Sequence, residues 1–75
     1  MKIDFDKLII DSGEKITKIG LAREMTEAGI FKSVRSAENM IQFHQSGKAK
    51  SCDYELLQYL MKRFNKNLLE IIDIN

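Results

Sequence analysis

The spacing of apolar residues is helical along almost the whole chain, and it predicts five short helices separated by polar turns. Capping residues precede the apolar stripes, and Gly or Asn follows most of them, as is usual at helix ends. The first four predicted helices run from Asp4 to Ser12-Gly13, from Thr17 to Gly29, from Ser33 or Ser36 to Gly47, and from Ser51 or Asp53 to Asn65. The last helix begins with a capping-box spacing from Asn67 to Glu70. Met1, Ile3 and Phe5 alternate with polar residues, so a short strand is an alternative at the start of the chain.

The apolar stripes of these helices predict one hydrophobic core. The fourth helix carries the longest regular stripe and is expected to anchor that core. Ile30 and Phe31 are large and apolar, so we expect them to tuck beneath the helices they connect. The predicted core residues are Phe5, Leu8 and Ile9; Leu21, Ala22 and Met25; Ala37, Met40, Ile41 and His44; Tyr54, Leu57, Leu60, Met61 and Phe64; and Leu68, Ile71 and Ile72.

The size of the chain limits it to one small domain, which we place at residues 1–75. Apolar residues make up 44% and charged residues 31% of the sequence, a balance typical of folded globular proteins. The predicted fold class is therefore all-α, a compact bundle of about five short helices.

Neither a membrane span nor an export signal is evident. The apolar runs are far shorter than the roughly 18 residues that a membrane helix needs. Met1-Lys2-Ile3-Asp4 does not have the pattern that opens a signal peptide. We therefore expect a cytoplasmic protein with no membrane partner.

The residues of common catalytic and metal sites are missing from the sequence. His44 is the only histidine and Cys52 the only cysteine, and no Ser or Cys has an assignable general base. His44 lies on an apolar stripe, which favours a partly buried structural role. We expect no enzyme activity, metal, cofactor or small-molecule substrate.

Charge is distributed unevenly along the chain. Residues 1–31 sum to −1, residues 32–51 to +3 and residues 52–75 to −1, which together give the net charge of +1. A local positive patch is typical of a surface that contacts phosphates, and an ordinary solvated surface is the alternative.

The segment from Thr17 to Ser51 has the physical features of a helix-turn-helix DNA reader. It contains an amphipathic helix, a turn, a second helix with one apolar and one polar face, and a short basic loop. Arg can pair with guanine, and Asn and Gln with adenine, so Arg35, Asn39 and Gln42 have the chemistry for base readout. Lys48 and Lys50 are suited to phosphate contacts.

Three segments resemble the Cro/C1-type (XRE) helix-turn-helix domain of phage and bacterial repressors. They are Thr17-Lys18-Ile19-Gly20-Leu21-Ala22, Gly47-Lys48-Ala49-Lys50-Ser51, and the run from Tyr54 to Ile72, which follows the family's fourth and fifth helices without a gap. Two departures stand out. The chain has Thr26 where the family places a Gly, and the segment from Ala22 to Met40 or Ile41 is several residues longer than in the family.

This resemblance implies a lambda-repressor-like domain with an extended second helix or turn and a helix-turn-helix unit at about 17–46. It further implies a stand-alone repressor-like regulator of a phage or mobile element that binds double-stranded DNA as a homodimer. Lys18 occupies a position where the family often contacts the DNA backbone. The expected DNA-binding residues are Lys18, Lys32, Arg35, Ser36, Asn39, Gln42, Lys48 and Lys50.

A protein-interaction module on the same scaffold, an antirepressor or an adaptor, is the alternative function, because a fold does not fix a function. An exposed apolar face would support it, and Phe31 and Phe43 are the residues that would show one.

Overall fold

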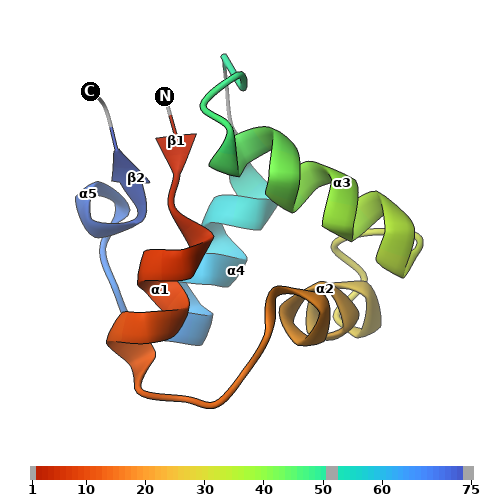
Figure 1. Ribbon diagram of the computed structural model, residues 1–75, viewed down its shortest axis with the longest axis horizontal. Coiled ribbons are helices and arrows are strands. Elements are labelled where there is room, and N and C mark those ends of the chain that lie inside the picture. The colour runs from red at the N-terminus through yellow and green to blue at the C-terminus, as the bar shows by residue number, and fades with distance from the viewer. Residues whose placement is uncertain (1, 51–52, 74–75) are drawn as a thin grey trace.

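The computed structural model describes residues 2–50 and 53–73, and these form five helices and one very short two-stranded ribbon (Figure 1). The predicted all-α bundle is therefore confirmed. The molecule measures 29 × 27 × 19 Å. No described helix has the length and apolar character needed to cross a membrane. In chain order the elements are β1 (Lys2–Ile3), α1 (Phe5–Ser12), α2 (Lys18–Glu27), α3 (Val34–Gln45), α4 (Tyr54–Phe64), α5 (Leu68–Ile71) and β2 (Ile72–Asp73).

Side-chain caps begin all five helices. In each case the capping oxygen accepts a hydrogen bond from a backbone N–H two or three residues later, which satisfies a donor that the helix itself leaves unpaired. Ser33, rather than Ser36, caps α3, and Asp53 caps α4, while Ser51 lies outside the described residues. Asn67 and Glu70 form the predicted capping box.

Both readings of the N-terminal segment are partly correct. β1 covers Lys2–Ile3 and pairs antiparallel with β2, so that Ile3 lies opposite Ile72. Asp4 then caps α1 immediately afterwards. The pairing brings the two ends of the described chain side by side, as Figure 1 shows.

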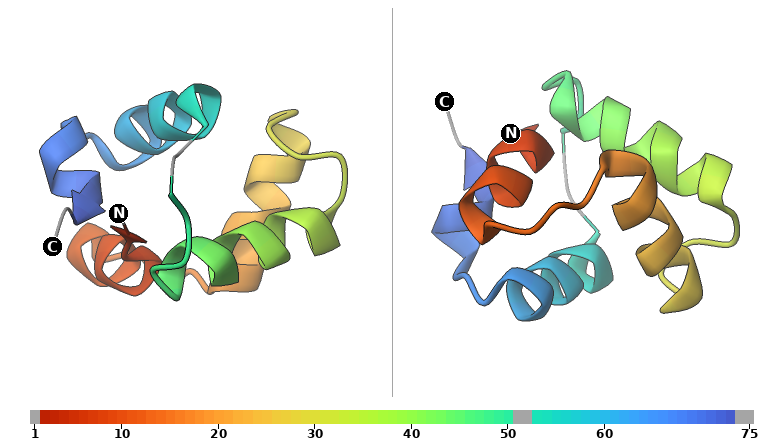
Figure 2. Two further views of the ribbon diagram at one scale, coloured as in Figure 1. Left: turned by 90° about the horizontal axis from the view of Figure 1, so that it is seen from above. Right: turned by 60° about the horizontal axis from the view of Figure 1, so that its bottom comes forward.

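One hydrophobic core joins all five helices and β1. The views in Figure 2 show α1, α4 and α5 toward one side of the molecule and α2 beside α3 toward the other. Ile30 and Phe31 are half-buried against this core, as predicted. The buried cluster comprises Ile3, Phe5, Leu8, Leu21, Ala22, Met25, Ala37, Ile41, Leu56, Leu60, Phe64 and Ile71.

The predicted core face of α4 is correct at Leu60 and Phe64, but Leu56 rather than Leu57 is fully buried. Leu56, Leu60 and Phe64 are its buried residues, whereas Leu57 and Met61 are only half-buried and Tyr54 is 69% exposed. The sequence offers two neighbouring stripes with i, i+4 spacing, and periodicity alone does not choose between them. Packing against the rest of the core selects the stripe that contains Leu56.

The last helix also differs from prediction. Ile71 is buried, but Leu68 is 44% exposed, and Ile72 belongs to β2. Four residues make little more than one helical turn, so α5 presents only one side chain fully to the core.

The connection between α2 and α3 is long. It covers residues 28–33, which is longer than the turn of about three or four residues that usually joins such a pair. Gly29 turns the chain there with a φ of 81°, a conformation that glycine adopts readily.

Candidate nucleic-acid interface

The two faces of α3 are chemically distinct. Ala37, Ile41 and His44 are buried toward the core. On the opposite side, the four α3 residues predicted to read DNA are all exposed: Arg35, Ser36, Asn39 and Gln42. The predicted segregation of polar and apolar positions is therefore confirmed.

Three of these four side chains have no hydrogen-bond or ion-pair partner among the described residues. Over the described ranges, Arg35, Asn39 and Gln42 take part in no side-chain hydrogen bond or ion pair. Ser36 differs, because the Ser33 hydroxyl donates to the Ser36 hydroxyl at 3.1 Å. Arg35, Asn39 and Gln42 thus present unused donors and acceptors to solvent.

Cations lie in the segments at both ends of α3. Lys32 precedes the helix, Lys48 and Lys50 follow it, and all three are exposed. In the part of the chain that is described, no carboxylate approaches any of them within 4 Å. Ala49 is only 2% exposed, so it holds the loop against the protein between its two lysines. Among the described residues, these three lysines therefore form no ion pair.

Lys18 is placed differently from the other predicted cations. Its Nζ lies 3.3 Å from Asp6 Oδ1 of α1, and both side chains are about half exposed. Part of its charge is therefore neutralised within the protein. The structure does not bring Lys18 into the group of unpaired cations that follow and precede α3.

His44 lies on the buried face of α3. It is 2% exposed, and burial lowers the pKa of its imidazole below 6.5 because the charged form is the less favourable one away from water. Its ring meets the Phe43 ring edge-on, with the centroids 6.1 Å apart. The burial expected for this residue is confirmed.

Gln45 fixes one end of α3 through contacts that the sequence did not reveal. Its Oε1 accepts a hydrogen bond from the Phe5 N–H at 2.8 Å, and its Nε2 donates to Asp4 Oδ1 at 3.2 Å. The backbone N–H of Lys7 and the amide of Gln45 both donate to the Asp4 carboxylate and lower its pKa. The C-terminus of α3 is thereby joined to the N-terminus of α1.

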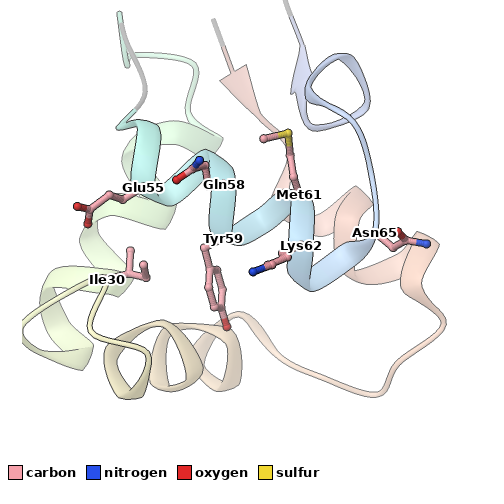
Figure 3. A pocket seen from close by; sticks show the side chains of 7 residues that line it. All are labelled: Ile30, Glu55, Gln58, Tyr59, Met61, Lys62 and Asn65. Atoms are coloured by element: carbon pink, nitrogen blue, oxygen red, sulfur yellow. The ribbon is translucent and has the colours of Figure 1, made fainter.

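Other parts of the described fold offer fewer candidate functional groups. The described segments contain no group of three or more His, Cys, Asp or Glu residues that could hold a metal ion. Cys52 lies outside the described residues. An open hollow on the outer side of α4, drawn in Figure 3, is lined by Ile30, Glu55, Gln58, Tyr59, Met61, Lys62 and Asn65, a mixed surface without a convergent set of polar groups.

Comparisons of this chain with protein-family models, with curated proteins and with solved structures found no match.

Proposed function

We propose that this protein is a sequence-specific DNA-binding transcriptional regulator, repressor-like in kind, which reads the major groove with α3. One observation carries the proposal. The outward face of α3 presents unused hydrogen-bonding groups of Arg35, Asn39 and Gln42, and uncompensated cations lie beyond both ends of the helix. The resemblance of the sequence to Cro/C1-type repressors supports it further.

The dimensions of α3 agree with this use. A helix of 12 residues is about 18 Å long, and the major groove is about 12 Å wide. A helix lying across the groove would therefore bring Lys32 toward one phosphate wall and Lys48 and Lys50 toward the other. The middle of the helix, where Asn39 and Gln42 lie, would then face the bases.

The chemistry of that middle section favours adenine. A carboxamide can accept from adenine N6 and donate to N7 at the same time, and such a bidentate pair contributes about 1–3 kcal/mol of discrimination. Arg35 can make the corresponding contact with guanine. A single domain of this size offers a small recognition surface, so we propose a homodimer on a pseudo-palindromic site.

Selection of bound duplexes from a random DNA library tests the proposal. We expect a preferred sequence whose selection relaxes at one or two base pairs in Asn39→Ala or Gln42→Ala, while affinity for random DNA changes little. Recovery of no preferred sequence by the wild-type protein would contradict sequence-specific binding.

The flanking lysines provide a second test with a matched control. Lys48→Ala combined with Lys50→Ala should weaken binding to all duplexes alike and reduce the salt dependence by about 1–2 units of slope. The control combines Lys15→Ala with Lys62→Ala. These lysines are also exposed and free of ion pairs in the described structure, so the control makes the same charge change outside residues 32–51. Equal losses of DNA affinity in the two double variants would show that the basic loop does not contact the DNA.

A protein-interaction module remains the second candidate, and Phe43 favours it because this aromatic ring is 47% exposed. Phe31 gives it no support, since its side chain is half-buried against the core. Absence of any preferred DNA sequence would make this candidate the leading one.

A further inference from the structure

Phe43 is the single apolar residue among the exposed side chains of α3. It follows Gln42 directly and lies four residues after Asn39, so its ring is on the same side of the helix as Asn39. An aromatic ring that is 47% exposed therefore lies one helical turn from the Asn39 carboxamide, on a surface that it borders together with Gln42.

The ring has a fixed support. It meets the ring of buried His44 edge-on, at an angle of 67° and a centroid distance of 6.1 Å. The Ser46 hydroxyl donates to the Phe43 backbone carbonyl at 2.8 Å, near the end of the helix. The Phe43 ring thus contacts His44 on one side and leaves part of its surface exposed to a partner.

The surroundings indicate what that partner is. Lys32, Arg35, Lys48 and Lys50 are exposed cations without a carboxylate nearby in the described chain, and they favour a polyanion over an apolar protein surface. The thymine C5 methyl is the apolar group that base pairs present in the major groove, and it belongs to the same base pair as the adenine that a carboxamide reads. An aromatic ring one turn from a carboxamide is therefore complementary to an A·T pair or to two adjacent ones.

We infer that Phe43 is a specificity-determining residue that contacts a thymine methyl group next to an adenine read by Asn39 or Gln42. The inference rests on the proposed function. The inference predicts that each half-site contains a thymine whose methyl group is required for full affinity. Hydrogen bonding by α3 alone would not require that methyl group.

The experiment replaces each thymine of the preferred duplex, one at a time, by deoxyuridine, which removes the methyl group and keeps the base pairing. Loss of one buried methyl corresponds to about a three- to tenfold loss of affinity. We expect wild-type protein to lose this much at one position per half-site. Phe43→Ala should bind the unmodified duplex more weakly by a similar factor and should be insensitive to deoxyuridine at that position.

Tyr54→Ala is the matched control, because Tyr54 is an aromatic residue of α4 that is 69% exposed. This variant should keep the wild-type sensitivity to deoxyuridine. The scan with wild-type protein needs no variant, so it tests the inference even if Phe43→Ala folds poorly.

Each outcome has a separate meaning. If wild-type protein has a preferred duplex but tolerates deoxyuridine at every position, the inference is wrong and the proposed function stands. The same holds if Phe43→Ala is folded and still as sensitive as wild type. If no duplex is preferred over random DNA, the proposed function fails together with the inference, and Phe43 belongs to a protein-binding surface.

Discussion

Gln42 and Gln45 lie about one turn apart on α3, yet the fold uses them in opposite ways. Gln45 accepts from the Phe5 N–H and donates to Asp4, so both ends of its amide are occupied by α1 and its cap. Gln42 is exposed, and its amide has no partner in the described protein. The same side chain therefore joins two elements in one place and is left for a partner molecule in the other.

Arg63 and Arg35 show the same contrast. Arg63 donates from Nη1 and Nη2 to the two oxygens of Glu14, at 2.8 Å each, and from Nε to Glu24 at 3.1 Å. These bonds lower the pKa of Glu14 and raise that of Arg63. Arg35 is exposed, and no carboxylate lies within 4 Å of it in the described ranges.

The lesson is that contacts between helices consume polar groups, whereas the outward face of α3 keeps its polar groups unused. Substitutions at the contacts should change the free energy of unfolding. Substitutions on the outward face should leave the free energy of unfolding unchanged and alter binding.

The largest effect is expected from a leucine of the core. Leu60→Ala should lower the free energy of unfolding by about 2–5 kcal/mol, because Leu60 is 0% exposed and its removal leaves a cavity. In a domain of this size such a loss could prevent folding. Leu69→Ala is the control, since Leu69 is 73% exposed, and should change stability by less than about 0.5 kcal/mol. Thermal melts followed by circular dichroism measure both, and equal melting temperatures would disprove the packing of α4.

The arginine pair should give the next largest difference. Arg63→Ala removes a bidentate ion pair and a second charged hydrogen bond, and we expect it to cost about 1–2 kcal/mol after screening by solvent. Arg35→Ala should stay within about 0.5 kcal/mol of wild type in stability. Chemical denaturation measures the free energy of unfolding of both variants. A larger loss of stability in Arg35→Ala than in Arg63→Ala would contradict the comparison.

The glutamine pair tests the separation within one helix. Gln45→Ala should destabilise the fold by about 1 kcal/mol, because the Phe5 N–H and the Asp4 carboxylate each lose a partner. Gln42→Ala should melt like wild type and lose affinity for the preferred duplex instead. The comparison fails if the two variants lose the same amount of stability.

The titration of His44 should add a pH dependence to the stability. Burial lowers its pKa in the folded state, while the unfolded chain binds a proton near pH 6.5. Stability should therefore fall as pH drops below 6.5, with a slope of at most about 1.4 kcal/mol per pH unit. The carboxylates of Asp4 and Glu14, whose pKa values are lowered from 3.8 and 4.5, lose their contributions only at more acidic pH.

His44→Gln should flatten this slope between pH 5.5 and 6.5, because His44 is the only histidine of the chain. Urea denaturation at several pH values measures it. An unchanged slope in a folded variant would show that another group controls stability in this range.

The five helices and most of their ends could be predicted from the sequence. Asp4, Thr17 and Asn67 cap helices through backbone groups no more than three residues away, and Asn65 ends α4 with a φ of 53°. The outward position of Arg35, Asn39 and Gln42 was equally predictable, because helical periodicity alone places them opposite the apolar stripe. These features depend on neighbours along the chain, which the sequence lists directly.

Tertiary structure decided what depends on residues far apart in the chain. Gln45 meets Phe5 across 40 positions, and Arg63 meets Glu14 across 49, so no local pattern distinguishes Gln45 from Gln42 or Arg63 from Arg35. The choice of Leu56 over Leu57 as a core residue of α4, and the pairing of Lys18 with Asp6, were decided in the same way. A side chain's periodicity gives the side of the helix on which it lies, but only the packed neighbours determine whether its polar groups are used inside the protein or remain for a partner.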